Sequence, residues 1–380
     1  MTYLFDHLTL REVVLHNRIV VSPMWQFQGF DGFSSDWHVM HLGRFAVGGA
    51  GIVFQEGTAV ERRGCGTVAD IGIWDDKFIP QLGRVARIME ENGTVPGVQL
   101  MHAGRKSRMK LPIDGRGQLQ KSPDLPDWDA WEPISASPVP LKEGLEPPRE
   151  MTQEDIDNVV TSFASAARRA AEAGYKALEI HAGHGYLPHQ FLSPLTNHRT
   201  DGYGGSLNNR MRMTLELTEA VRLAWPSHLP LFIRLSCIDG AGWELEDTIA
   251  LVKELLPLGV DVVDCSTGGL VGSPLRDGET LHYGYQVKYS RAVREATGAR
   301  TMAVGLIVRP EHAESILRDG DADLIAIARE VVLNPNWPLY AAVKLGVEDP
   351  YAHADTYARY WLRHREESFP GFVSSIQGMH

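Results

Sequence analysis

The chain has 380 residues, of which 43% are hydrophobic and 22% are charged, and its formal net charge is −11. These proportions are typical of a soluble globular protein, and the negative charge disfavours nucleic acid and anionic membranes as partners. The first residues lack a basic region followed by an apolar core, and no apolar run is long enough to span a bilayer. We therefore expect a cytoplasmic protein without a signal peptide.

The three cysteines, Cys65, Cys237 and Cys265, are scattered along the chain, and none belongs to a CxxC pair. An odd and scattered set argues against a disulfide framework and is typical of a reducing compartment. It also disfavours a structural zinc site.

Eight short apolar runs alternate with helical patterns along the chain. Several helical patterns end in glycine a few residues before the next run, as at Gly93, Gly174 and Gly259. Glycine at this place is typical of a helix C-cap that precedes a buried parallel strand. In chain order, the predicted strands are Ile19–Met24, Gly51–Gly57, Val98–Ala103, Ala177–Ala182, Leu231–Ser236, Asp261–Ser266, Thr301–Leu306 and Asp323–Ala328.

The starts of several helices are also marked. Residues 152–155 resemble a capping box before a helix, Pro310 fits the first turn of another helix, and Ser206 is expected to cap the helix that runs to Trp225. Alternation of strands and helices requires a parallel sheet, and eight units in one chain favour a closed (β/α)8 TIM barrel over an open sheet. No GxGxxG follows the first strand, which disfavours a Rossmann fold.

We predict one barrel domain over residues 1–380 with two additions. Residues 105–150 follow the third strand and are rich in proline, glycine and charge, so we interpret them as a capping loop over the barrel mouth. Residues 346–380 form a C-terminal extension over or near the active site, which either covers the site or reaches a neighbouring subunit.

Two histidines and a tyrosine follow the fourth predicted strand, at the end where a barrel places its chemistry. His181, His184 and Tyr186 can all donate hydrogen bonds to an oxygen that gains negative charge in a reaction. The alternative is a pair of satisfied loop histidines. A metal site would need a third ligand such as His189 or His198, and the spacing matches no zinc pattern, so no metal is expected.

The ends of the last two strands predict a phosphate site. Gly305 follows the seventh strand, and Ala328 and Arg329 follow the eighth. Backbone N–H groups and a guanidinium bind phosphate well, and barrels often place phosphate at these two loops. In the alternative interpretation, Gly305 only permits a turn and Arg329 pairs with Glu330 or Asp323.

Two polar residues interrupt apolar strands. Arg234 indicates either a cation beside the electron-rich end of a flavin ring or a structural salt bridge, perhaps with Glu179. Gln99 offers the donor and acceptor that match a pyrimidine-like edge, or it is a buried glutamine satisfied by backbone groups.

Four segments together resemble the old yellow enzyme family of FMN-dependent ene-reductases, and the resemblance extends over about residues 4–345. The bacterial class that includes xenobiotic reductase A and the thermophilic-type ene-reductases is the most similar. The four segments are residues 17–24 (NRIVVSPM), 99–106 (QLMHAGRK), 181–187 (HAGHGYL) and 193–205.

The resemblance implies a role for each site residue. Ser22, Pro23, Met24, Trp25 and Gly57 line the FMN ring, Gln99 bonds its pyrimidine edge, Arg234 lies near N1, and Gly305, Ala328 and Arg329 hold the phosphate. His181 and His184 bind the substrate oxygen, Tyr186 is the proton donor, and Phe27 and Trp361 complete the substrate site.

Three positions depart from the family pattern. Trp25 stands where the class usually has cysteine, Phe27 stands where relatives have tyrosine, and Ala328 replaces the usual glycine before the phosphate arginine. These departures bear on substrate preference more than on FMN binding.

The resemblance implies an NAD(P)H oxidoreductase that reduces activated C=C bonds of enones and nitroalkenes by ping-pong hydride transfer from the flavin N5, and that forms a dimer or tetramer. Nitro compounds, nitrate esters and quinones are alternative substrates on the same scaffold. A flavin-binding sensor without turnover and a non-redox barrel hydrolase are alternative functions. The hydrolase is disfavoured because residues 303–305 end the seventh strand without the acid that a two-acid mechanism needs.

Overall fold

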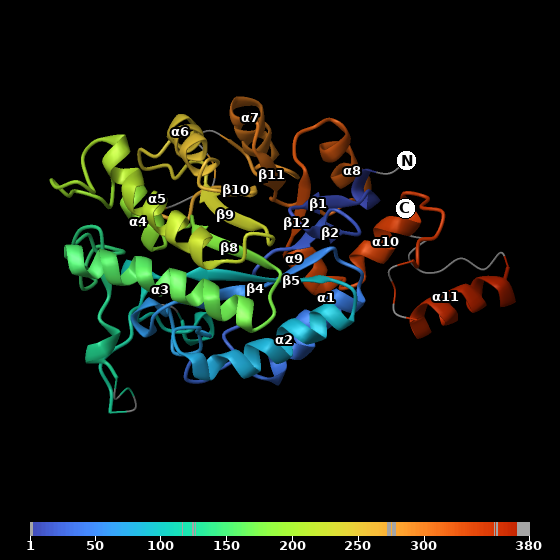
Figure 1. Cartoon of the computed structure of the whole chain (residues 1–380), viewed down its shortest axis with the longest axis horizontal. Coiled ribbons are helices and arrows are strands. Elements are labelled where there is room, and N and C mark those ends of the chain that lie inside the picture. The colour runs from blue at the N-terminus through green and yellow to red at the C-terminus, as the bar shows by residue number, and fades with distance from the viewer. Residues whose placement is uncertain are drawn as a thin grey trace.

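The computed structural model describes residues 3–115, 117–123, 125, 127–271, 275, 279–352, 354 and 356–370. In this part of the chain, parallel strands form a closed barrel in the order β10-β11-β12-β3-β4-β5-β8-β9 (Figure 1). The predicted TIM barrel is confirmed, because each predicted strand overlaps one barrel strand. The strands are β3 (Ile19–Val21), β4 (Ile52–Ala59), β5 (Val95–Met101), β8 (Ala177–Ala182), β9 (Leu231–Ser236), β10 (Val262–Ser266), β11 (Arg300–Ala303) and β12 (Leu324–Ile327).

Helices follow the barrel strands and cover the outside of the barrel. The predicted signals hold where they can be checked: Thr152 caps α3 in a capping box, Pro310 opens α8, and Ser206 caps α5. The helices are α1 (Asp36–Val47), α2 (Ile79–Glu91), α3 (Gln153–Glu172), α4 (Leu187–Leu192), α5 (Leu207–Ala224), α6 (Leu245–Leu255), α7 (Val287–Thr297), α8 (Pro310–Arg318), α9 (Arg329–Leu333), α10 (Trp337–Lys344) and α11 (Thr356–Ser368).

The glycines that were predicted to end helices have positive φ angles. Gly93, Gly174 and Gly259 have φ of 82°, 90° and 92°. Glycine adopts this left-handed conformation at little cost, so the chain can turn from each helix into the next strand.

A small hairpin closes the amino end of the barrel. It consists of β1 (Leu8–Leu10) and β2 (Val13–Leu15), which pair antiparallel. Leu10 and Leu15 are buried in one apolar cluster with inward-facing strand residues such as Phe54 and Phe232. The amino end of the barrel interior is therefore a packed apolar core.

The segment between β5 and α3 has little regular structure. It contains the short pair β6 (Ile134–Ser135) and β7 (Arg149–Glu150) and a few 3-10 turns. The indole of Trp131 is buried here and donates a hydrogen bond to the carbonyl of Cys65. Among the described residues, we find no helix with the length and apolar character needed to cross a membrane.

Candidate active site

The carboxyl end of β8 carries His181 and His184 side by side. Their rings lie edge to face with centroids 5.1 Å apart. His184 has a positive φ of 53°, and its backbone N–H donates to Oγ of Ser236 at 2.8 Å. Burial lowers the pKa of both imidazoles well below the ordinary value, and the nearby Arg234 adds to the effect. Both imidazoles are therefore neutral near pH 7.

The hydrogen-bond partners fix the proton of His181 and allow either tautomer of His184. The backbone N–H of Gly183 donates to Nδ1 of His181 at 3.3 Å, so the His181 proton is on Nε2. Nε2 of His184 lies 2.7 Å from Oγ of Ser266, a hydroxyl that can donate or accept in this bond and that also accepts from Gln286. Nδ1 of His184 lies 3.4 Å from Nε2 of His181. When the His184 proton is on Nδ1, both nitrogens can donate to one acceptor oxygen that lies near them.

Tyr186 lies against the histidines and the β3 loop. Its ring centroid is 4.6 Å from that of His181 and 5.6 Å from that of Trp25. Burial raises the pKa of the Tyr186 phenol far above its ordinary value, so the phenol keeps its proton near neutral pH. A protonated phenol beside the histidine pair can serve as a proton donor.

Lys106 is a site residue to which the sequence analysis gave no role, although it lies in one of the motifs of the family resemblance. Its ammonium donates to the carbonyls of His184 and Gly269 at 2.5 and 2.6 Å and lies 5.3 Å from the ring centroid of Tyr186. Burial lowers the pKa of Lys106 to about 8. Lys106 therefore fastens the loop that carries His184 and places a cation beside the phenol.

Four buried side chains form the floor of the site. The Gln99 amide donates to Oε1 of Glu179 at 2.7 Å, and Nε of Arg234 lies 3.1 Å from Oδ2 of Asp264. The sequence suggested Glu179 as the ion-pair partner of Arg234. This suggestion is wrong, because the carboxylate that pairs with Arg234 belongs to Asp264. Gln99 is bound by a side chain, not by the backbone.

The loop after β3 is fixed from below by α1. The backbone N–H of Gln26 donates to Glu56, whose other oxygen lies 3.0 Å from Nε2 of His38. His38 and Glu56 are both buried. This support was not predicted, because nothing in the sequence shows that a histidine of α1 lies against the end of β4.

The phosphate candidates lie together at the ends of β11 and β12. Gly305 has a φ of 112°, and Arg329 begins α9 directly after Ala328. All three line one cavity of about 470 Å³. The alternative partner Asp323 pairs instead with Arg294, at 3.1 Å.

Three cavities meet at the barrel mouth. A central one of about 260 Å³ lies over Gln99 and Arg234, and it shares His184 and Arg234 with the phosphate cavity. An outer cavity of about 710 Å³ shares Trp25, Lys106, Tyr186 and Gly269 with the central one. The outer cavity is lined in part by residues of the predicted capping loop, namely Met109, Lys110, Pro112, Leu141 and Lys142.

Most of the predicted site residues line these cavities. Pro23, Trp25 and Gly57 border the central cavity, and Phe27 borders the outer one. Ser22 and Met24 lie below the loop, where they line a separate small void beside Glu56, and Oγ of Ser22 has no hydrogen-bond partner there.

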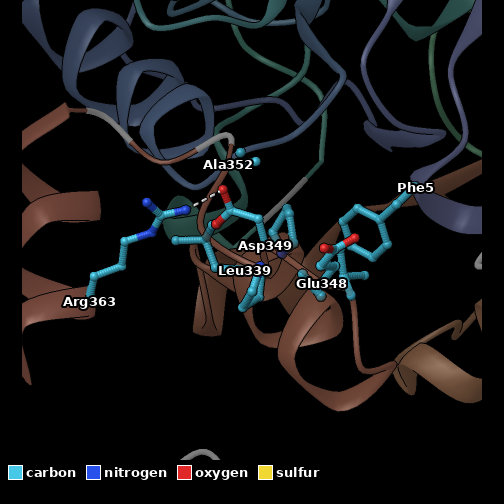
Figure 2. Close-up of a pocket in the computed structure, with 11 residues that line it drawn as sticks. Phe5, Leu339, Glu348, Asp349, Ala352 and Arg363 are labelled. Atoms are coloured by element: carbon cyan, nitrogen blue, oxygen red, sulfur yellow. Dashed lines mark hydrogen bonds and ion pairs between the residues drawn. The ribbon is translucent and has the colours of Figure 1, made fainter. Parts of the chain in front are cut away.

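Trp361 lies elsewhere. It is 63% exposed on α11, beyond α10 in Figure 1, and it lines none of the three mouth cavities. Figure 2 shows a separate cavity of about 520 Å³ between Phe5, α10 and α11, where Arg363 reaches Asp349. The structure thus does not bring Trp361 to the mouth of its own barrel.

The described residues contain no group of three potential metal ligands. His189, considered above as a third ligand, accepts a hydrogen bond on Nδ1 from the backbone N–H of Gly185, and its Nε2 faces Asp239 at 3.7 Å. It therefore supports the loop between His184 and Tyr186 from below.

Comparison with known proteins identifies the family. The model of the NADH:flavin oxidoreductase / NADH oxidase family matches residues 3–348. The chain belongs to this family, the old yellow enzyme family. It is 40% identical over 349 residues to an NADPH dehydrogenase of Geobacillus sp. (strain WCH70), covering 91% of this chain and 95% of the relative. It is also 40% identical over 367 residues to an NADPH dehydrogenase of Listeria monocytogenes serotype 4a (strain HCC23), covering 95% and 100%.

Solved structures agree with this assignment. Morphinone reductase superposes with a TM-score of 0.75 at 26% identity, covering 91% of this chain and 90% of the other. As a member of this family, the present chain uses FMN and a nicotinamide nucleotide as cofactors.

The residues of the barrel mouth fit FMN. The phosphate cavity and the central cavity adjoin at His184 and Arg234, which line both, as the site of a ring with a phosphate tail requires. A Cβ atom at Gly57 would lie 3.0 Å from Cγ of Met101 and 3.3 Å from Oε1 of Gln99, so a larger residue there would push against two side chains that line the central cavity. Gln99 and Arg234 would hold the ring, and Arg329 with Gly305 would hold the phosphate.

Proposed function

We propose that this protein reduces activated C=C bonds, as in enones and nitroalkenes, with electrons from NADPH or NADH. The observation that carries the proposal is the pair of ring nitrogens, Nε2 of His181 and Nδ1 of His184, which lie 3.4 Å apart on residues that line the central cavity. With the His184 proton on Nδ1, a carbonyl or nitro oxygen about 3 Å from both nitrogens would accept from both.

The neutral state of the two histidines suits this role. An oxygen conjugated to the double bond gains negative charge as the double bond is reduced, and both N–H groups bond it more strongly then than in the ground state. Removing one such donor is expected to lower kcat by roughly 10²-fold. FMN, when bound, supplies the hydride for the β-carbon.

Tyr186 would protonate the α-carbon. It is the nearest phenol to His181, and burial keeps it protonated. Trp25, which contacts Tyr186, and Phe27 form an apolar wall beside it, with their ring centroids 5.6 Å apart, and would limit the access of water to the reacting carbons.

The proposal is tested with purified protein loaded with FMN. Under argon, NADPH should bleach the flavin absorbance, and cyclohexenone should restore it with formation of the saturated ketone. Failure to bind FMN would favour a non-redox protein, and bleaching without recovery in the presence of enones, nitroalkenes and quinones would favour a sensor. Recovery only with quinones or nitrate esters would contradict C=C reduction.

The histidine pair has its own test. The double variant His181→Ala/His184→Ala should retain FMN but lose the long-wavelength charge-transfer band that appears when a phenol binds over the flavin. His198→Ala is a matched control, because His198 is an exposed histidine on the following loop. Retention of the band in the double variant would refute the donor assignment.

A further inference from the structure

Two buried carboxyl groups lie in the floor of the site without an obvious role. Glu179 and Asp264 are both 0% exposed, and they come from β8 and β10, on either side of β9. The strand register places Gln99 beside Glu179 and Arg234 beside Asp264. The two carboxyls are thus each in contact with one of the residues that face the flavin cavity.

The hydrogen-bonding atoms of these carboxyls are not satisfied by the rest of the protein. Oε2 of Glu179 and both side-chain oxygens of Asp264 are buried without a well-directed hydrogen bond, although Nε of Arg234 lies 3.1 Å from Oδ2 of Asp264. The two side chains are nevertheless close enough to hydrogen-bond to each other. Because ionised carboxylates only accept hydrogen bonds, a proton between them is what can satisfy both.

We propose that Glu179 and Asp264 share one proton in the oxidised enzyme, and that this pair binds a second proton when the flavin above it is reduced. The inference rests on the proposed binding of FMN. Glu179 and Asp264 touch no reacting atom, so they are positioning residues that act through Gln99 and Arg234.

The charges of the floor explain why the pair should respond to the flavin. With one shared proton, the charge of the two carboxyls is −1 and balances Arg234. Reduction of the flavin adds negative charge above the floor, which favours protonation of the remaining carboxylate. One proton from solvent then converts the carboxylate to a carboxylic acid, and no electron moves to or from the pair.

Other titratable groups near the floor behave differently. His181 and His184 stay neutral, because burial lowers their pKa well below the ordinary value. Burial raises the pKa of Glu179 to about 8 and raises that of Asp264 as well, so both carboxyls hold protons more tightly than exposed carboxyls do. Lys106 also titrates at about 8, so the experiment must separate it from the pair.

The test is the midpoint potential of the bound FMN between pH 6 and 10, a range chosen to span the titration of the pair. The wild-type potential should fall more steeply with pH over part of this range, by up to one additional proton per two electrons, or about 30 mV per pH unit. Glu179→Gln and Asp264→Asn should each remove the steeper segment while retaining bound FMN. Lys106→Met, which removes the other group near pH 8, should keep it.

Wild-type protein alone gives a second readout if a variant does not fold. The infrared difference spectrum between reduced and oxidised enzyme should show the carbonyl stretch of a newly protonated carboxylic acid, shifted in D₂O. A potential with one slope throughout, together with no carboxylic acid band, would overturn the proposal. Loss of the steeper segment in Lys106→Met would assign it to the lysine instead. A protein that takes up no FMN would refute the proposed function itself.

Discussion

The indole of Trp25 meets the ring of Tyr186 edge to face, with centroids 5.6 Å apart and planes at 82°. Trp25 stands where the family resemblance leads us to expect cysteine, so this contact between the β3 loop and the proposed proton donor is a feature of this chain. Both residues line the central and the outer cavity, so the contact lies where the two cavities adjoin.

Replacing Trp25 by cysteine should therefore open space where the central and outer cavities adjoin and change substrate preference. We expect the ratio of kcat/KM for a bulky cyclic enone to that for a small one to rise by roughly tenfold, the scale of a pocket contact. The flavin absorbance maximum should shift as well. Phe30→Ala is a suitable control, because Phe30 lies on the same segment but is 81% exposed. An unchanged ratio would place Trp25 outside the substrate path.

Ser266→Ala should affect catalysis through His184. Without the hydroxyl at 2.7 Å, the ring of His184 loses the hydrogen bond that holds it in place beside His181. We expect kcat to fall by up to roughly 10²-fold and phenol binding to weaken, with FMN retained. Ser315→Ala, on α8, should leave both unchanged. Normal phenol binding in Ser266→Ala would show that Ser266 does not position His184.

Arg329→Met should weaken FMN binding more than it alters turnover of the loaded enzyme. A charge-assisted hydrogen bond contributes about 1.5–3 kcal/mol, which corresponds to a roughly 10- to 100-fold higher Kd. Quenching of FMN fluorescence on titration with the apoprotein measures this directly. Arg318→Met is the control, since Arg318 pairs with Asp319 on the outer surface of α8. Equal Kd values for the two variants would contradict a phosphate site at Arg329.

Lys106 should make stability depend on pH in an alkaline window. Its pKa is about 8 in the folded protein against an ordinary 10.5, so between these values the unfolded chain binds more protons than the folded one. The free energy of unfolding of the wild type, relative to Lys106→Met, should therefore rise with pH from about 8 to 10.5 and be constant below 8. Urea titrations at several pH values measure the difference. A difference that stays constant or falls across this window would show that the Lys106 ammonium is not destabilised by burial.

The barrel and the residues at its strand ends were predictable because their signals are local. Apolar runs preceded by glycine locate strands, and the first polar residues after a run, such as His181 and Arg329, lie at the mouth of any such barrel. The sequence did not reveal which polar side chains meet. Asp264, not Glu179, lies against Arg234 because the register between β9 and β10 pairs them, and that register depends on the packing of the whole sheet.

Residues that act through backbone groups were also missed. Lys106 reaches two carbonyls on loops that follow other strands, at His184 and Gly269, and no local pattern predicts such a contact.

The placement of α11 involves ion pairs of Arg359 and Arg363 with Asp349. The sequence shows the aromatic motif that includes Trp361, but it does not show where this helix lies.

The hairpin of β1 and β2 has a consequence for the order of binding. Because Leu10 and Leu15 belong to the apolar cluster at the amino end, we expect the nicotinamide donor and the electron acceptor both to approach bound FMN from the carboxyl end, where Trp25 and Tyr186 line the central cavity. We therefore expect the two reactants to exclude each other, so that an excess of either one inhibits the half-reaction of the other.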